Sequence, residues 1–504
     1  MAILRLLVAG VFTFLYTRQI GLRFGSALLS MFTFTFSGPL VSWLGFPPAH
    51  VIVWLPALFL CTEKVVASPL AARRWLAASA VVVGLQFLGG QPEVSFQVLL
   101  AWVAYTLFRT LGAPDKRLRH AWRALCWLLA AGLLGALLAA VQLAPFIEAL
   151  EHSVIFADRQ SETFQGVAVL LRRIMADWRE WPALLLALLP HFFGTEQDNS
   201  YWFPSSNSIE LSLYAGLLPL LLALAVAWQA VRQPAHPQRG LILFFTLFAV
   251  VSLALAVRLP LFNAINQLPL FNIALPGRLR LVYVFGVAVL AGFGFQAWQN
   301  QTPGYQRLVL RLLALAALAT VVLNGAAYAG FTFFADRLIA NGQAFMAANI
   351  GTPYFDRSLA YYENLVLERQ ALKLALYRPG NVVMYLPVLI AASVWIFTRW
   401  RRARSPSIGM GAPLVGLVLL DLFAVNAGFN TTTPRQLLYP LPGALAYLQR
   451  DRSIFRISGD GLALNPNTSM LYGLADIRSY DAMLPRRYAN LLRQMDGFSP
   501  VGHH

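Results

Sequence analysis

Long apolar runs joined by short basic connectors constrain this chain more than any other feature. Residues 124–144, 211–231, 240–257 and 281–297 each approach the length of about 20 residues that a helix needs to cross a bilayer. Hydrocarbon offers no water to the backbone, so these runs are predicted to be helices. A chain that is 58% hydrophobic and 12% charged cannot bury that much apolar surface in an ordinary soluble core. We therefore expect a membrane protein.

The hydropathy pattern predicts an all-α polytopic fold, a bundle of about 12 transmembrane helices. Lys and Arg residues recur in alternate connectors, which by the positive-inside rule face the cytoplasm. The expected helices cover residues 3–17, 22–38, 48–62, 75–90, 94–108, 121–144, 211–231, 240–257, 280–298, 306–330, 381–398 and 410–427. The basic connectors hold Arg18 and Arg23; Lys64, Arg73 and Arg74; Arg109, Lys116, Arg117 and Arg119; Arg232 and Arg239; Arg307 and Arg311; and Arg399, Arg401, Arg402 and Arg404.

The net charge of +17 does not indicate a nucleic-acid partner, because the cations are dispersed over short connectors and form no single basic face. Cys61 and Cys126 both lie in apolar segments, so they make neither a disulfide framework nor a metal-ligand spacing. The first 16 residues are followed by no small-residue cleavage site and run on into further apolar sequence. We predict no cleavable signal peptide.

Parity of the helices then places every long polar segment on the outer face. Two domains are expected: residues 1–430 form the bundle with outer loops at 145–210, 258–280 and 331–380, and residues 431–504 form an incomplete extracytoplasmic segment. Amphipathic outer helices are predicted at 167–181 and twice within 331–378. The C-terminal segment is expected to be a small partial α+β unit, because a strand-like run at 453–457 stands between turn signals.

The succession of motifs resembles the YfhO family of bacterial membrane proteins. The chain carries, in order, GGQPE, LPHFFG, IELSLYAGLLPLLLAL, LPLF, PGRLRLVYVFGVAVLAGFGFQ, LLDLFAVNAGFN and FRISGDGLALNPNTSMLYGLADIRSYDAMLPRRY. The family is similar to GT-C glycosyltransferases, which transfer a sugar from a polyprenyl-phosphate carrier on the outer face. The resemblance thus implies a GT-C-like bundle. It also implies an essential acidic residue in a first outer loop that this chain lacks, so we expect truncation at both ends.

Such chemistry needs a carboxylate to deprotonate the acceptor hydroxyl and cations to steady the departing phosphate. Glu93 lies at an outer turn after two glycines and a proline, and it is our candidate catalytic base. The alternative is that it caps the following helix, where a carboxylate favours the N-terminal dipole. Arg278 and Arg280 follow a proline-glycine turn and could bind a lipid-linked phosphate. Their alternative role is snorkelling anchorage at the membrane boundary.

Residues 191–216 form the longest polar interruption between apolar runs, and we expect substrate contacts there from His191, Tyr201, Trp202 and Glu210. His191, Glu196, Asp198 and Glu210 could together hold a divalent cation or bind a sugar, with Tyr201 and Trp202 as a stacking surface, although their spacing matches no defined metal motif. The alternative is a solvated loop anchored by an aromatic belt. Within the last apolar run, Asp421 is expected to pair inside the bundle and lock helix packing, with Asn426 as a further polar partner.

We therefore predict a multi-pass protein of the bacterial plasma membrane that moves a sugar from a polyprenyl-phosphate donor to a cell-envelope polymer or lipid acceptor. The alternative is a transporter or flippase of a lipid-linked substrate, which would also need a helical bundle with intramembrane polar residues. An inactive fragment is a third interpretation. The expected partners are membrane lipid, donor and acceptor, and no nucleic acid.

Overall fold

The computed structural model describes residues 2–67, 72–111, 117–154, 178–203, 206–235, 237–268, 271, 274–300, 303–352, 355, 357–404, 411–459, 464–478 and 483–494. Within these ranges the chain is helical and contains no β-strand, which confirms an all-α fold. It divides into two units. Unit 1 comprises Met1–Ala140, Val167–Ala348 and Ser358–Asn430, and unit 2 comprises Val141–Gly166, Asn349–Arg357 and Thr431–His504.

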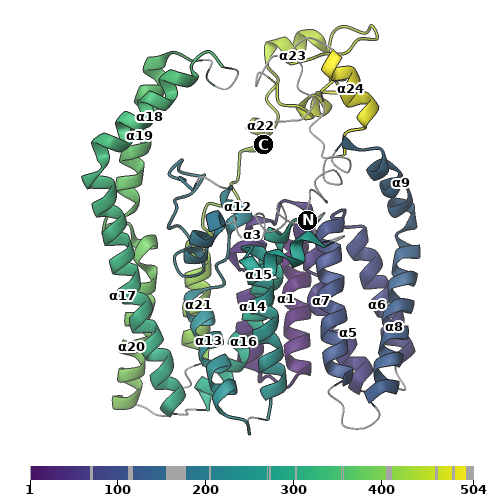
Figure 1. The fold of residues 1–504 in the computed structure, drawn as a ribbon, viewed down its shortest axis with the longest axis vertical. Coiled ribbons are helices and arrows are strands. Elements are labelled where there is room, and N and C mark those ends of the chain that lie inside the picture. Colours follow the sequence, from purple (N-terminus) through teal and green to yellow (C-terminus); the bar gives the residue numbers. More distant parts are fainter. Residues whose placement is uncertain are drawn as a thin grey trace. The chain divides into compact units, whose positions relative to one another are not determined.

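Unit 1 is a helical bundle with short 3-10 segments between its longer helices (Figure 1). Its α-helices are α1 (Ala2–Gln19), α2 (Phe24–Thr35), α3 (Gly38–Ser42), α4 (Pro47–Ile52), α5 (Leu55–Ala67), α6 (Ala72–Phe87), α7 (Pro92–Leu111), α8 (Arg117–Leu138), α12 (Ser208–Leu211), α13 (Leu217–Arg232), α14 (Arg239–Ala256), α15 (Pro260–Asn263), α16 (Arg280–Gln299), α17 (Pro303–Phe333), α18 (Ala335–Asn349), α19 (Leu359–Leu376), α20 (Leu386–Arg404) and α21 (Gly411–Asn426). Its 3-10 helices are η2 (Trp178–Ala187), η3 (Ile265–Gln267), η4 (Pro276–Leu279) and η5 (Val382–Tyr385).

Several of these helices can cross a membrane by length and composition. Within the described residues seven stretches qualify, namely Ala2–Gln19, Pro47–Ala67, Pro92–Leu111, Arg239–Ala256, Pro276–Gln299, Pro303–Phe333 and Val382–Trp400. The pair Leu125–Leu138 and Ala140–Glu151 makes an eighth if it is one broken span. Helices α2, α13 and α21 are apolar but shorter. The chain is thus a helical protein with several membrane-length spans, whereas the count of twelve is not confirmed and stays a prediction.

The core of unit 1 is built around α16, which packs against α2, α13 and α14. Its side chains are buried almost continuously from Arg280 to Phe295, so the helix is apolar on all sides, as expected of a central span. Two glycines permit the close packing. A Cβ atom at Gly292 would lie 2.2 Å from the hydroxyl oxygen of Ser30, and one at Gly294 would lie 2.4 Å from the carbonyl oxygen of Leu222.

The two ends of unit 1 differ in character (Figure 1). Short basic connectors meet at one end, here called the basic end. There the side chain of Arg23 donates to Asn300 at 2.9 Å and that of Gln238 to the carbonyl of Ile20 at 3.4 Å. The opposite end, here called the polar end, holds α3, α12, α15 and η4. The separation agrees with the alternation of charge along the sequence.

The segments predicted to be outer amphipathic helices are described in part. Most of the helix expected at 167–181 falls outside the described residues, and 178–187 form the 3-10 helix η2. The two helices expected within 331–378 are present as α18 and α19. Ser358 begins α19 by accepting a hydrogen bond from the N–H of Tyr361, as an N-cap residue does.

Unit 2 consists of short helices in its described part. These are α9 (Ala140–Glu151), α22 (Arg435–Leu438), α23 (Gly443–Leu448), η6 (Thr468–Tyr472) and α24 (Arg486–Gln494). The predicted α+β character is not confirmed, because the strand-like run at 453–457 forms a single parallel bridge, Ile457 to Asp476. Along this run Ile454 and Arg456 are exposed, whereas Phe455 and Ile457 on the other face are partly buried.

Candidate functional site

Six charged side chains from separate segments meet at the polar end of unit 1. We call them the charge cluster: Glu93, Glu180, Glu210, Arg258, Arg278 and Arg280. They come from the first turn of α7, from η2, from α12, from the turn after α14, from η4 and from the first residue of α16. Of the predicted site residues, the structure thus brings together the catalytic candidate and three of the substrate-binding candidates.

Local sequence signals fix three elements that carry half of this cluster. Pro92 starts α7, where its missing N–H costs nothing, and so places Glu93 in the first turn. Pro276 starts η4 in the same way ahead of Arg278. Asn207 caps α12, because its side-chain oxygen accepts a hydrogen bond of 2.9 Å from the N–H of Glu210.

Arg278 bridges two carboxylates of the cluster. Its Nη1 donates to Oε2 of Glu93, and its Nη2 lies 3.8 Å from Oε1 of Glu210. The guanidinium also lies over the ring of Trp43, at 5.3 Å from the centroid, and the side chain is 13% exposed. Helix α7 is tied to the segment before η4, because the side-chain amide of Gln97 donates to the carbonyl of Leu275 at 2.9 Å.

Arg280 is more deeply buried, with 3% of its side chain exposed. Its Nη2 donates to Oε2 of Glu180 at 3.0 Å, and its Nη1 donates to the backbone carbonyl of Glu210 at 2.8 Å. Arg258 lies 4.0 Å from the other oxygen of Glu180. A snorkelling anchor keeps its charged head in water. The guanidiniums of Arg278 and Arg280 instead point into the protein, so anchorage does not describe them.

Two donors of the cluster are buried without a partner in the described part of the chain. These are the Nε atoms of Arg278 and Arg280. Such donors are rare in folded proteins, which usually satisfy them. Gly277 allows the guanidinium of Arg280 to pack close to the backbone, since a Cβ atom there would lie 2.9 Å from Nη1 of Arg280 and 3.7 Å from Oε2 of Glu210.

Glu210 differs electrostatically from an ordinary surface carboxylate. Burial raises its pKa above the ordinary value, and the nearby guanidiniums of Arg278 and Arg280 offset this effect only in part. The neighbouring carboxylates of Glu93 and Glu180 act in the same direction as burial. Glu210 is therefore the carboxylate of the cluster that takes up a proton more readily than usual, which suits a general base.

The other residues predicted in the polar loop do not join the cluster. His191 and Tyr201 line a cavity of about 50 Å³, with Ser212 and Asn426 among its other walls. Burial lowers the pKa of His191 and so favours the neutral imidazole. The hydroxyl of Tyr201 donates to the carbonyl of Ser206 at 2.5 Å. This small polar cavity is therefore separate from the charged site.

Trp202 lies in neither the charge cluster nor the small cavity, and it packs in an aromatic group with Phe331 and Tyr377. Its indole N–H donates to the hydroxyl of Tyr377 at 3.0 Å, and its ring packs edge-on against Phe331. Within the described residues, no three His, Cys, Asp or Glu side chains gather as a metal site would require. The divalent cation considered from the sequence thus has no ligand cluster in the described part of the chain.

Asp421 is paired inside the bundle, as its sequence context predicts. It accepts hydrogen bonds from the hydroxyl of Tyr214 at 2.6 Å and from the N–H of Leu217 at 2.9 Å, so α21 caps the start of α13. Asn426 does not share this pairing. Its amide donates to the carbonyls of Phe36 and Leu422.

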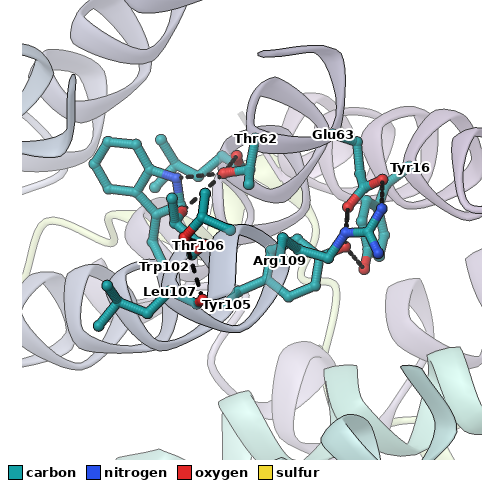
Figure 2. A network of polar contacts seen from close by, with 10 residues as sticks. Tyr16, Thr62, Glu63, Trp102, Tyr105, Thr106, Leu107 and Arg109 are labelled. Carbon is teal, nitrogen blue, oxygen red and sulfur yellow. Dashed lines mark hydrogen bonds and ion pairs between the residues drawn. The ribbon is translucent and has the colours of Figure 1, made fainter. Parts of the chain in front are cut away.

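A second polar network lies at the basic end and was missed by sequence reasoning (Figure 2). Glu63 on α5 binds Arg109 on α7 through two hydrogen bonds, of 2.5 and 2.9 Å, and also accepts one from the hydroxyl of Tyr105. Tyr16 on α1 donates to Tyr105 at 2.9 Å. The signal was available, because Glu63 stands in an apolar run, where a carboxylate needs a partner. Lys64 beside it suggested a solvated connector instead.

Comparison of this chain with protein-family models, with curated proteins and with solved structures gives no match. Its function must therefore be argued from its own side chains. The charge cluster is the strongest basis for that argument, because it combines three partly buried carboxylates, the buried guanidinium of Arg280 and, among the described residues, two buried donors without a partner.

Proposed function

We propose that this protein is a GT-C-type membrane glycosyltransferase of the YfhO kind, which moves a sugar from a polyprenyl-phosphate carrier to an acceptor on the outer face of the bacterial plasma membrane. The observation that carries the proposal is the charge cluster at the polar end. Transfer from a phosphate leaving group needs a base and fixed cations, and the cluster supplies both groups side by side.

In the proposed reaction the acceptor hydroxyl oxygen attacks the anomeric carbon of the sugar. The bond from that carbon to the phosphate oxygen breaks, and its electron pair leaves with polyprenyl phosphate. The acceptor proton passes to the carboxylate of Glu210. Arg278 and Arg280 bind the phosphate, whose negative charge increases by one as it departs.

Glu93 takes a positioning role in this proposal. Its carboxylate is held by Arg278 and by the side-chain amide of Gln91, at 3.3 Å, so it fixes the guanidinium that faces Glu210. It occupies the first turn of α7. Glu210 is our candidate base because burial raises its pKa and its contact with Arg278 is longer than that of Glu93.

The test uses the purified full chain with a radiolabelled polyprenyl-phosphoryl hexose and follows the release of polyprenyl phosphate by thin-layer chromatography. We expect Glu210→Gln to slow release by at least about 100-fold, the lower range for loss of a general base. Arg278→Ala is expected to weaken donor binding. Glu368→Gln on α19 is the matched control, because this carboxylate is exposed and remote from the cluster in sequence and element.

Unchanged release by Glu210→Gln would remove the proposed base, and unchanged release by Arg278→Ala would remove the proposed phosphate site. If Glu368→Gln slowed the release of polyprenyl phosphate as much as Glu210→Gln, the loss would reflect the removal of any one carboxylate charge and not a specific role of Glu210. If the intact chain released polyprenyl phosphate from none of several hexose donors, the proposed sugar transfer would be contradicted.

The proposal also requires the polar end to face outward, as the basic connectors predict. Ser206 lies in the polar loop and Cys126 is an exposed native thiol, so the test places Ser206→Cys in a chain carrying Cys126→Ala. A membrane-impermeant maleimide should label this cysteine in intact cells. Labelling only after the inner face is opened would place the proposed chemistry in the wrong compartment.

A lipid-linked substrate transporter is the second candidate, and one observation favours it. The network of Glu63, Arg109, Tyr105 and Tyr16 places ionisable groups among the membrane-length helices α1, α5 and α7, where such residues often serve transport. Reconstituted protein should then carry a fluorescent polyprenyl phosphate across liposomes, and Glu63→Gln should abolish the movement. If the protein releases polyprenyl phosphate from the sugar donor but does not move the fluorescent lipid across liposomes, the result favours sugar transfer over transport.

A further inference from the structure

An apolar groove of about 540 Å³ lies in unit 1, apart from the charge cluster. Its walls come from the last turns of α17, from the start of α18 and from the loop before α12. Apolar side chains make up nearly all of its lining, which includes Trp202, Leu323, Phe331, Phe334, Leu338 and, as its single charged residue, Arg337.

The floor of this groove is held rigidly by polar contacts outside it. Trp202 donates its indole N–H to Tyr377, and Tyr377 donates its hydroxyl to the carbonyl of Phe192. The rings of Phe331 and Tyr377 stack with their centroids 5.7 Å apart. The side-chain amide of Gln370 donates a hydrogen bond of 2.8 Å to the backbone carbonyl of Phe331. Because these side chains are fixed from behind, they cannot turn inward and fill the space.

The groove runs along the last turns of α17. With 31 residues and a rise of about 1.5 Å per residue, α17 is about 46 Å long and exceeds a hydrocarbon core of about 30 Å. The lining from Leu323 to Phe334 covers about 17 Å of helix axis, close to half of that core in length. The length of this lining is therefore comparable to that of a single lipid leaflet.

Two cations stand at this groove without an acidic partner. Arg337 lines it, and the ammonium of Lys373 lies 5.7 Å from the ring centroid of Phe331. Neither cation has a carboxylate within salt-bridge distance among the described residues. Burial and the neighbouring Arg369 lower the pKa of Lys373. An anion at this place would favour the charged amine.

We infer that the groove binds an anionic phospholipid, with one acyl chain along α17 and the headgroup phosphate between Arg337 and Lys373. The apolar lining, its length of about 17 Å and the two cations, which have no carboxylate partner among the described residues, together favour this class of ligand. The inference does not depend on sugar transfer.

The test uses Trp202 as an internal reporter. The full chain, purified in detergent, is titrated with phosphatidylglycerol that carries bromine atoms on its acyl chain, and tryptophan fluorescence is recorded. The difference between wild type and Trp202→Phe isolates this residue among the 13 tryptophans. We expect saturable quenching of Trp202. Brominated phosphatidylcholine should need a higher concentration for the same quenching.

Variants at two glycines of α17 form a matched pair. A Cβ atom at Gly330 or at Gly325 meets nothing within 4 Å, so a larger side chain is added at either place without a backbone clash. Gly330 lines the groove and Gly325 does not. Gly330→Leu should abolish the quenching, and Gly325→Leu should leave it unchanged. Equal quenching in all three proteins would overturn the inferred site.

The role of the cations is tested in the same assay. Each Lys or Arg near a membrane surface contributes about a five-fold gain in affinity for anionic lipid, so Arg337→Gln with Lys373→Gln should reduce the preference for phosphatidylglycerol by about 30-fold. A preference that survives both changes would overturn the headgroup assignment. Displacement by polyprenyl phosphate at lower concentration than by unbrominated phosphatidylglycerol would overturn the choice of phospholipid.

Discussion

The ion pair between Glu63 and Arg109 at the basic end gives the sharpest test of how this bundle is held together. The side chain of Glu63 is 5% exposed and that of Arg109 is 27% exposed. Replacing Glu63 with Gln keeps the shape and one acceptor but leaves the guanidinium without its counter-charge. Breaking a buried pair in this way costs about 3–5 kcal/mol. Because Arg109 retains some access to solvent, we expect a loss near about 3 kcal/mol in the free energy of unfolding.

The measurement is equilibrium unfolding in mixed micelles, followed by tryptophan fluorescence, for a double-mutant cycle of Glu63→Gln and Arg109→Gln. The double variant should be more stable than the sum of the single losses predicts, with a coupling of about 2 kcal/mol. Additive losses, or a single loss below about 1 kcal/mol, would show that the pair contributes no more than an exposed salt bridge. Our account of the network as a link between α5 and α7 would then be wrong.

Three further outcomes are expected from the same unfolding assay. Asp421→Ala should cost about 2–3 kcal/mol, because it removes the acceptor of the Tyr214 hydroxyl and one of the two acceptors of the Leu217 N–H at the start of α13. Gly277→Val should cost about 1–3 kcal/mol, because its Cβ atom would displace the guanidinium of Arg280. The raised pKa of Glu210 means that folding favours its protonated form, so wild type should lose stability relative to Glu210→Gln as pH rises from about 4.5 through the raised pKa. A pH-independent difference would contradict that assignment.

Hydropathy located the helices well but could not count the spans. Each of the twelve predicted segments contains a helix, since an apolar run in lipid has no other way to satisfy its backbone. The run at 22–38 shows why length fails. Helix α2 ends at Thr35 and α3 begins at Gly38, because Pro39 lacks an N–H and starts a new helix. Hydropathy sums apolar side chains and does not register such breaks.

The sequence allowed the charged residues of the site to be predicted, but not the ion pairs that they form. Glu93, Arg278, Arg280 and Glu210 were each identified from turns and charges beside apolar runs, and they meet in the structure. Which carboxylate faces which guanidinium depends on contacts across 68 to 185 positions. No periodicity encodes contacts of that range. For the same reason Trp202, eight positions before Glu210 in the chain, lies in a different group of side chains.

Arginines near the helix ends of this bundle divide into two kinds by the partner of the guanidinium. At the basic end Arg232 and Arg399 stack on Trp228 and Trp395, each one turn away on its own helix, as anchors in an interface do. In the charge cluster three guanidiniums meet three carboxylates, so the cluster is formally neutral. Desolvating each charge costs several kcal/mol, and neutrality offsets that cost only while every pair is intact. A bound anion would add one negative charge, and proton uptake by one carboxylate would restore the balance. Burial already raises the pKa of Glu210 toward that uptake, so under the proposed function the binding of a phosphate would be coupled to proton uptake at this residue.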